Sequence, residues 1–362
     1  MDNVRITYIK NIEELDQFSE EWDDLLEVCD GSSPLQSYAW TKAYFNHYIA
    51  EKKTRWICLF AHQDDQMVAV YPLIFQKSRN FPGIHFQWFH QPYDIFHTVR
   101  TDGLILPGYE FVLQLFVNKI RSTLKVFPII QISKIPVYSA SYRSLANQNL
   151  KLNLQFLLKP SGNEEFIESN ISLEEYILGL NAKFRSELRR KTRRLEESFR
   201  ITYIFGYTGY HERCLDQFIK LEDSGWKGHN NTSLKKRGKD QDLFKKGTGY
   251  LHEKGWIEWN FLKADNKIIA AQMHIKKFGV SFLWKTAYNE DFSDYSPGNI
   301  LLFKYFQNAI QKKLYKEINF LNERKWFERW NVKKRKLYNV IIFPKAFLVS
   351  NLIKIYYKLK YS

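Results

Sequence analysis

The sequence predicts an α/β protein made of two copies of one structural unit, and two pairs of similar segments support this. WICLFAHQDDQMVAVYPLIF (56–75) and IEWNFLKADNKIIAAQMHIK (257–276) each predict a β-hairpin with a polar turn. Two later segments also resemble each other: one begins PGYEFVLQLF at Pro107 and the other PGNILLFKYF at Pro297. Each starts with a Pro-Gly pair and predicts an amphipathic helix followed by a short strand. Both pairs occur in the same order about half a chain apart, which indicates a duplication.

The segments around these pairs complete the two copies. Residues 11–22 and 34–48 predict helices ahead of the first hairpin. A longer helix is predicted over 172–199, with Ser172 and Glu175 placed as a capping box. KPSGN (159–163) is the best candidate for a linker. We therefore expect two domains, 1–162 and 163–362.

Composition limits the classes of protein that the chain can belong to. Hydrophobic residues make up 44% of the 362 residues, enough for two packed cores. No apolar run has the length of a membrane span, and MDNVRITYIK does not read as a signal peptide, so we expect a cytoplasmic protein. The three cysteines lie far apart without zinc-type spacing, so no metal is expected. The net charge of +15 favours anionic partners.

The strand VSFLWKTAY (280–288), the loop after it and Pro297-Gly298 predict an anion site. A helix N-terminus presents unpaired backbone N–H groups, and glycine lets a ligand approach them closely. Proline is also a common first-turn residue for structural reasons alone. Of these two interpretations, the wider sequence context must decide.

A basic run, KFRSELRRKTRR (183–194), lies on the predicted long helix. Such runs usually form a solvated helix face, and the functional alternative is contact with a polyphosphate, a lipid phosphate or a tRNA backbone. No RNA- or DNA-binding signature occurs in the chain, so a nucleic-acid partner is not expected.

A few polar residues could carry chemistry. His274 lies on the second strand of the second hairpin, and Glu258 begins the first, so either could act as a general base; Tyr288 could protonate a leaving thiolate. A lone strand histidine is more often structural. Trp226 and Lys227 lie in a glycine-rich loop and could line an acceptor pocket. No nucleophile elbow, Walker loop or dinucleotide-binding fingerprint is present.

The stretch VIIFPKAFLVSNLIKIYYKLKY (340–361) mixes apolar and basic residues without an acid. It predicts either an amphipathic helix in a membrane interface or a last helix docked on the core. A peripheral position on the inner face of the cell membrane, on an anionic surface, follows from the first alternative.

Five segments together resemble the CelD-like (BcsL) branch of the GNAT acyltransferases, which is related to the FemAB-type transferases with tandem GNAT domains. They are spread over most of the chain: SPLQSYAW (33–40), KFRSELRRKTRRLEE (183–197), LEDSGWKG (221–228), AYNEDFSDYSPGNILL (287–302) and NFLNERKWFERW (319–330). The resemblance implies tandem GNAT-like domains, each a mixed, mostly antiparallel sheet flanked by helices. The predicted duplication agrees with this architecture.

The resemblance also implies transfer of an acyl group from acetyl-CoA or a longer acyl-CoA to an amine or hydroxyl. The donor pyrophosphate is then expected at Ser296, Gly298 and Asn299, with Lys285 nearby. The substrate, a sugar or lipid-linked precursor of the cell envelope, is expected at Arg185, Trp226, Lys227, Trp326 and Arg329. The chain departs from the family where it has Asn289 and Asn319 in place of Asp, and Phe327 in place of Lys. These departures put substrate charge and activity in question.

The function predicted from the sequence is an acyl-CoA-dependent N- or O-acyltransferase whose second copy carries the site. One alternative is an aminoacyl-tRNA-dependent transferase of the FemAB type, although the chain has no sustained heptads for the long coiled coil of such relatives. The other is a non-catalytic GNAT-fold scaffold of an envelope-biosynthesis complex.

Overall fold

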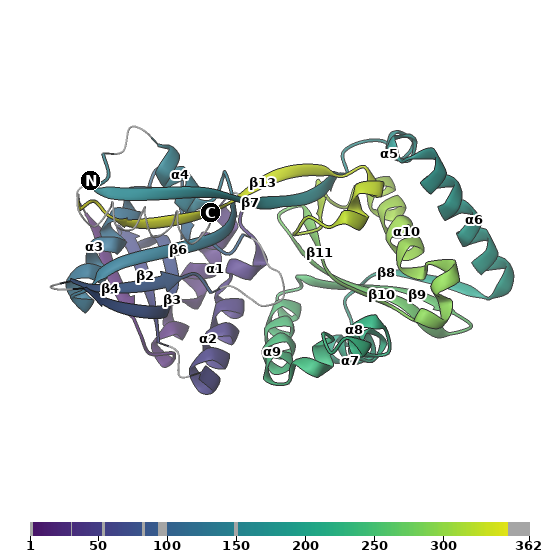
Figure 1. The fold of residues 1–362 in the computed structure, drawn as a ribbon, viewed down its shortest axis with the longest axis horizontal. Helices are drawn as coiled ribbons and strands as arrows, with labels where there is room; N and C mark the ends of the chain where they lie inside the picture. Colours follow the sequence, from purple (N-terminus) through teal and green to yellow (C-terminus); the bar gives the residue numbers. More distant parts are fainter. Residues whose placement is uncertain are drawn as a thin grey trace. The chain divides into compact units, whose positions relative to one another are not determined.

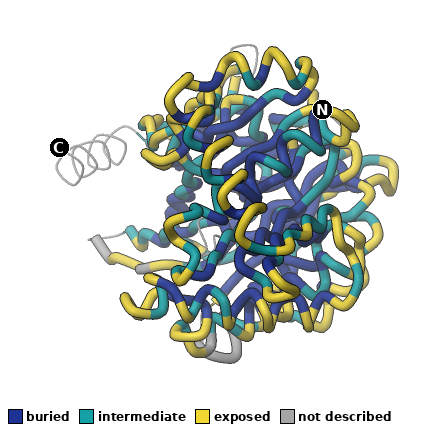
Figure 2. The backbone as a smooth tube through the Cα atoms, turned by 90° about the vertical axis from the view of Figure 1, so that its right-hand side faces the viewer, coloured by how far each residue is buried: buried dark blue, intermediate teal, exposed yellow. Residues whose placement is uncertain are grey.

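The structure is a computed structural model that describes residues 3–29, 31–52, 55–81, 84–92, 100–147 and 151–346. The chain divides into two compact units. Unit 1 comprises Met1–Gly162 with the chain from Lys336 on, and unit 2 comprises Asn163–Arg335. Figure 1 shows the elements of each, and Figure 2 shows that buried residues follow the strands while exposed ones follow the turns.

Unit 1 is a mixed sheet with helices packed on it. Its strands run in the order β1-β2-β3-β4-β6-β13, with β5 beside β3; β4 and β6 are parallel, and the other neighbouring pairs are antiparallel. Its elements are β1 (Val4–Ile9), η1 (Glu13–Phe18), α1 (Ser19–Val28), η2 (Pro34–Gln36), α2 (Tyr38–Lys52), β2 (Trp56–Gln63), β3 (Gln66–Phe81), β4 (Ile84–His90), β5 (Leu104–Ile105), α3 (Val112–Leu124), β6 (Phe127–Pro136), α4 (Ala140–Ala146) and β13 (Lys333–Pro344).

Unit 2 repeats this plan. Its strands run in the order β7-β12-β11-β10-β9-β8, with β11 and β12 parallel and the other pairs antiparallel. Helices α5, α6 and α10 cover one face of this sheet, and α7 to α9 cover the other (Figure 1). Its elements are β7 (Leu154–Glu168), α5 (Leu173–Gly179), α6 (Ala182–Ser198), β8 (Ile201–Tyr207), α7 (His211–Asp223), α8 (Trp226–His229), η3 (Leu234–Arg237), α9 (Lys239–Glu253), β9 (Ile257–Ala264), β10 (Lys267–Lys277), β11 (Val280–Tyr288), η4 (Glu290–Tyr295), α10 (Pro297–Gln311), β12 (Glu317–Asn319) and η5 (Lys325–Trp330).

The duplication predicted from the sequence is present in the structure. Both hairpins turn on two residues with positive φ, Asp64-Asp65 in the first and Asp265-Asn266 in the second, which is the geometry that a two-residue hairpin requires. Each Pro-Gly segment leads into a helix, α3 or α10, that lies in the chain between two parallel strands. The molecule therefore has the predicted mixed α/β fold, with two units of the same plan.

Three expectations about elements were wrong. The helix over 172–199 is two helices, because Asn181 starts a new one by accepting hydrogen bonds from the N–H groups of Lys183 and Phe184. The linker candidate 159–163 does contain the division between the units, which falls after Gly162, but it is part of the continuous strand β7 and not a loop. Residues from Lys336 on belong to unit 1 instead of the second domain, because β13 pairs with β6.

That pairing also changes the interpretation of the C-terminal stretch. Residues 340–344 form the end of a buried strand and not a helix. The part of 340–361 that follows Ala346 lies outside the described residues. Within the described residues, no helix combines the length and the apolar character needed to cross a membrane.

Candidate functional site

The start of α10 is built for close approach to its backbone. Strand β11 leads through η4 to Ser296, whose φ of 54° and ψ of 56° turn the chain into the helix, with Pro297 at its first position. No acidic residue lies in the first turn of α10. The backbone N–H groups there, and the positive end of the helix dipole, have no carboxylate of that turn beside them.

A cation from another helix lies at this helix start. Lys191 Nζ on α6 is 2.6 Å from Ser296 Oγ and 3.3 Å from a carboxylate oxygen of Glu187. Helix α6 is amphipathic, and its buried side chains Phe184, Leu188 and Leu195 fix the turn on which Lys191 lies. A positive charge beside a helix N-terminus is electrostatically unfavourable unless an anion is also present. The arrangement therefore suits a bound phosphate.

Strands β11 and β12 separate next to this helix start. Their parallel ladder covers three residue pairs and ends at Phe282 with Asn319. Beyond that point the N–H of Phe320 donates to Glu165 O of β7, so the chain leaves β11. Strand β11 continues to Tyr288 and contains a bulge at Trp284, between the pairs His274–Leu283 and Met273–Lys285.

The loop that carries Trp226 lies against the same connection. The backbone N–H of Trp226 donates to Glu290 Oε1 at 2.6 Å, and the indole is half exposed, with a relative exposure of 51%. A side chain placed at Gly298 would meet the ring of Tyr288 at 3.4 Å. Trp226, Glu290, Tyr288 and the start of α10 thus form one local cluster.

His274 and Glu258 lie in a buried hydrogen-bond network under α10. His274 Nδ1 is 2.9 Å from Ser281 Oγ, which is 2.7 Å from the Tyr305 hydroxyl. The hydroxyls of Tyr305 and Tyr315 donate to Glu258 at 3.1 and 2.7 Å. Because Ser281 lies on β11, the network joins Glu258 to the strand that borders the separation from β12.

Burial sets the protonation states in this network. It lowers the pKa of His274 to about 3, so the imidazole is neutral at neutral pH. Burial also raises the pKa of Tyr305 well above its ordinary value, which keeps that hydroxyl a donor. Nδ1 of the neutral imidazole faces Ser281 Oγ and Nε2 faces Gln272 Oε1 at 3.4 Å, so the tautomer is set by the direction in which the Ser281 hydroxyl points. Lys276 Nζ lies 3.6 Å from Glu258 and is the nearby cation.

The other predicted site residues divide into two groups. Lys285 Nζ lies over the ring of Phe244 on α9, so it is directed to the face of the sheet that α7 to α9 cover. Lys227 Nζ is 2.7 Å from the buried carboxylate of Glu222, which already offsets its charge. The backbone of Asn299, by contrast, is part of the start of α10, with its N–H donating to Ser296 O.

Arg185, Trp326 and Arg329 gather where α5, α6 and η5 meet. Arg185 donates to the carbonyls of Ile177 and Leu178, and Arg329 lies over the ring of Phe184. Glu187 joins this group to Lys191, because its carboxylate is 3.8 Å from Arg329 and 3.3 Å from Lys191.

The positions at which the chain departs from the CelD-like pattern have structural partners. Phe327 is buried against Phe320. The Asn319 amide donates to Glu164 and Glu317, which also pair with Arg335. Asn289 caps η4 by accepting from the N–H of Asp291. All three side chains are therefore part of the packing of unit 2.

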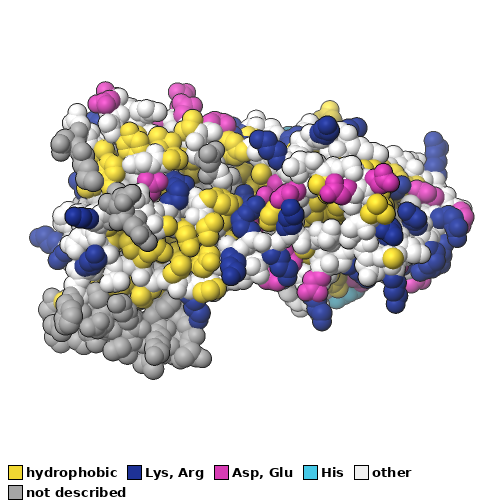
Figure 3. Space-filling view, turned by 90° about the horizontal axis from the view of Figure 1, so that it is seen from above, with side chains coloured by type: hydrophobic (Ala, Val, Ile, Leu, Met, Phe, Trp, Pro, Cys, Tyr) yellow, Lys and Arg dark blue, Asp and Glu magenta, His cyan; other side chains and the backbone are white. Residues whose placement is uncertain are grey.

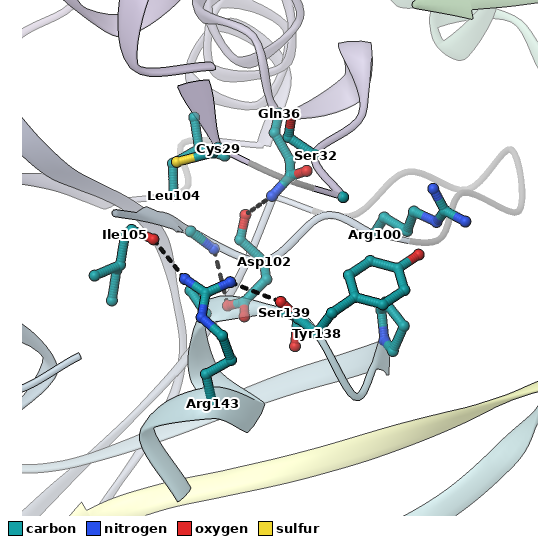
Figure 4. Close-up of a pocket in the computed structure, with 14 residues that line it drawn as sticks. Cys29, Ser32, Gln36, Arg100, Asp102, Leu104, Ile105, Tyr138, Ser139 and Arg143 are labelled. Atoms are coloured by element: carbon teal, nitrogen blue, oxygen red, sulfur yellow. Dashed lines mark hydrogen bonds between the residues drawn. The ribbon is translucent and has the colours of Figure 1, made fainter. Parts of the chain in front are cut away.

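The corresponding helix start in unit 1 is closed by the protein itself. Glu110 Oε2 accepts the N–H of Gly108 at 3.0 Å, and Glu110 Oε1 pairs with Arg143. The adjoining pocket is lined by residues that satisfy one another (Figure 4). In it Asp102 accepts from Gly103 and Ser141, and Arg143 donates to the carbonyls of Tyr138 and Ile105. The N–H of Gly108, in the turn that precedes α3, thus donates to a carboxylate of the protein itself.

Comparison with known proteins identifies the domain type in unit 2. The family described as "Acetyltransferase (GNAT) domain" matches residues 182–328. Among curated proteins, no sequence match is significant. Residues 182–328 include α6, the Trp226 loop, the buried network and the start of α10, so these features belong to a GNAT-type acetyltransferase domain.

Solved structures share the fold of the whole chain at low identity. FemX is 13% identical over 96% of this chain and 99% of its own, with a TM-score of 0.62. A conserved protein of unknown function from Bacteroides thetaiotaomicron is 12% identical over 94% and 100%, with a TM-score of 0.56. L-PGS from Bacillus licheniformis is 14% identical over 94% and 95%, with a TM-score of 0.50. These identities establish similarity of fold.

Proposed function

We propose that the chain is an acyl-CoA-dependent N- or O-acyltransferase of the CelD-like type, with its donor site in unit 2. The observation that supports this most strongly is Lys191 Nζ at 2.6 Å from Ser296 Oγ, at the first turn of α10. The N–H of Gly298, the Ser296 hydroxyl and the Lys191 amine form a donor set that suits the pyrophosphate of coenzyme A.

The separation of β11 from β12 suits the remainder of the donor. A chain that contains amide groups can hydrogen-bond to a strand edge as an added strand does. In this proposal the pantetheine arm follows β11 from the start of α10 toward the bulge at Trp284. The thioester then lies near this bulge, where β11 is no longer paired with β12, and the buried network that ends at Glu258 reaches β11 three residues away, at Ser281.

Glu258 is the better placed of the two proposed bases. Transfer forms a C–N or C–O bond, breaks the C–S bond and releases one proton from the acceptor. His274, with its pKa lowered to about 3, is too weak a base to hold that proton. We infer that the proton passes through Ser281 and Tyr305 to Glu258, and that the departing thiolate regains a proton from water.

Tyr288 has a different place in this scheme. Its ring packs at Gly298, roughly 13 Å along β11 from Trp284 at about 3.3 Å per residue. In this proposal it shapes the phosphate end of the site, and protonation of the thiolate by its hydroxyl stays a prediction. Trp226 and Glu290 are the side chains that would border the part of an acceptor that extends toward the start of α10. An amine or hydroxyl of an envelope sugar or lipid precursor is the acceptor that we propose.

The proposal is tested by a thermal-shift titration with acetyl-CoA, a long-chain acyl-CoA and free coenzyme A. A ligand that binds the folded state raises its stability, so a saturable increase in Tm is expected for all three. A larger shift with one acyl form would define the chain length. If none of them shifts Tm while an aminoacyl-tRNA does, the donor is of the FemAB type. If no donor shifts Tm, the scaffold alternative is favoured.

A further inference from the structure

A surface of unit 2 that combines exposed apolar side chains with cations is not used by the proposed reaction. It is formed by the end of α5, the first half of α6 and η5, and we call it the α5–α6–η5 surface. Leu178 at the end of α5 is 65% exposed, and Trp326 on η5 is 42% exposed. Lys and Arg side chains are numerous at the end of unit 2 that carries α6 (right in Figure 3).

The segments of this surface are held together by direct contacts. Arg185 donates to the carbonyls of Ile177 and Leu178, which fixes the end of α5 against α6. The Tyr176 hydroxyl donates to the carbonyl of Trp330 on η5. Gly179 packs directly on Asn331, the residue that ends η5. Leu178 and Trp326 are thus exposed parts of one rigid surface.

Cations surround these two apolar side chains. Lys183, Arg189 and Arg190 are exposed, and no ion pair is recorded for them with any residue that the structure describes. Lys325 and Arg329 extend the charge onto η5. The carboxylates of this region are Glu187, which pairs with Lys191 and Arg329, and the exposed Glu328, Glu174 and Glu175. The cations of α6 and η5 exceed these carboxylates, so the surface is positive.

We propose that the α5–α6–η5 surface docks on the surface of an anionic lipid bilayer. Tryptophan and leucine can enter the interface between headgroups and acyl chains, while lysine and arginine remain at the level of the phosphates. Each Lys or Arg near an anionic membrane adds to the attraction. A nucleic acid would also bind these cations, but its binding would not account for the exposed Leu178, whereas insertion into a lipid bilayer does. Trp326 and Arg329, expected to contact substrate, would then meet a lipid-linked acceptor at the membrane.

The test is co-sedimentation of the full chain with vesicles, without any acyl donor, so that it does not depend on the proposed reaction. Wild-type protein is expected to bind vesicles of phosphatidylcholine with phosphatidylglycerol, to ignore pure phosphatidylcholine, and to dissociate at high salt. The triple variant Lys183→Ser, Arg189→Ser, Arg190→Ser should bind at least about tenfold more weakly, and so should Leu178→Ser combined with Trp326→Ala.

Matched controls remove the same groups elsewhere on unit 2. The triple variant Lys246→Ser, Lys312→Ser, Lys313→Ser loses the same charge, and Leu314→Ser removes another exposed leucine. Both should bind vesicles as the wild type does. Vesicle binding that the surface variants leave unchanged would overturn the proposal, because another part of the chain would then be responsible. Wild-type protein that ignores anionic vesicles but binds a single-stranded RNA through Arg189 and Arg190 would also overturn it.

Discussion

Lys191 differs from the other cations of the basic helix in its surroundings. Its amine contacts Ser296 and Glu187 and its side chain is mostly buried, whereas Lys183, Arg189 and Arg190 point to solvent. The sequence shows all seven cations of 183–194 alike. The buried leucines of α6 determine the side of the helix on which Lys191 lies. The contact of Lys191 with α10 depends on how α6 packs, and the spacing of residues along the chain does not specify that packing.

Replacing Lys191 by Ala should weaken binding of coenzyme A by about tenfold to a hundredfold, because a charge-assisted contact contributes about 1.5–3 kcal/mol. Isothermal titration calorimetry measures this directly. Lys312→Ala, at the far end of α10, is the matched control and should bind as the wild type does. Equal affinity of the Lys191 variant and the wild type would remove this side chain from the site.

Glu258 and His274 can be separated by conservative variants. Glu258→Gln keeps the shape of the side chain but removes the proton acceptor, so kcat should fall by about 10²–10⁴. His274→Asn keeps a donor toward Ser281, so kcat should fall far less. Donor binding should change little in either variant. A larger loss of kcat in His274→Asn would reverse the assignment of the base.

The buried histidine also predicts a pH dependence of stability. The folded pKa of about 3 lies below the ordinary value of 6.5, so between these values the unfolded chain binds more protons and acid favours unfolding. The free energy of unfolding should thus fall as pH decreases from about 6.5 toward 3, with His274 contributing up to about 1.4 kcal/mol per pH unit. Denaturant titrations of His274→Asn should show a correspondingly smaller slope.

His211 should contribute in the same direction and remains in that variant, since burial and the nearby His252 lower its pKa to about 4. An unchanged slope in His274→Asn would contradict the burial of His274.

At the level of single residues, the sequence indicated the types of group present at the site but not their surroundings. Alternation correctly placed His274 and Gln272 on one face of a strand, yet helix α10 covers that face and buries both. Lys227 looked free to meet an anion because its partner Glu222 lies on the preceding helix and faces inward. Such partners depend on how the elements pack against one another, which the periodicity of residues along one element does not show.

At the level of elements, the two Pro-Gly helix starts show how one motif has two outcomes. Just before α3, the carboxylate of Glu110 accepts a hydrogen bond from the N–H of Gly108. In α10, by contrast, the first turn has no acidic residue, and Lys191 contacts Ser296 at its start. The position of Glu110 two residues after Gly108 is a signal present in the sequence. The role of a carboxylate at this position depends on its ion pair with Arg143, which the sequence alone does not reveal.

Glu110→Gln should therefore destabilise unit 1 by about 1–3 kcal/mol, since it leaves the partly buried Arg143 without its ion-pair partner. Chemical denaturation measures the change. Glu174→Gln, on the exposed first turn of α5, is the control and should change stability by less than about 0.5 kcal/mol. A fall in donor affinity in Glu110→Gln, without loss of stability, would place the donor in unit 1.

Regular elements were predictable where local signals are strong. The hairpin turns, α10 and the amphipathic face of α6 follow from residue pattern and turn chemistry. The break at Asn181 was missed because the flanking segment is helical on both sides and contains no proline. Strand β7 was missed at 159–163 because its Pro, Ser and Gly normally mark a loop, whereas here strand pairing overrides that preference.

At the scale of the whole molecule, the duplication could be recognised from two repeated segments because hairpins and helix starts are local. The return of β13 to unit 1 could not, since pairing between β13 and β6 joins residues about two hundred positions apart. The functional difference between the units also arises at this scale. Both copies have parallel strands joined through a helix, and among the described residues only unit 2 places a lysine from a neighbouring helix at the start of that helix.

The most direct test of the account is amide hydrogen exchange followed by mass spectrometry, with and without saturating acetyl-CoA. The two copies serve as internal controls for each other. The account predicts slower exchange in peptides that cover the start of α10, around Gly298, and the end of β11, with no change around Gly108 in unit 1. Slower exchange at Gly108, or no change at the start of α10 under conditions in which acetyl-CoA is shown to bind, would contradict it.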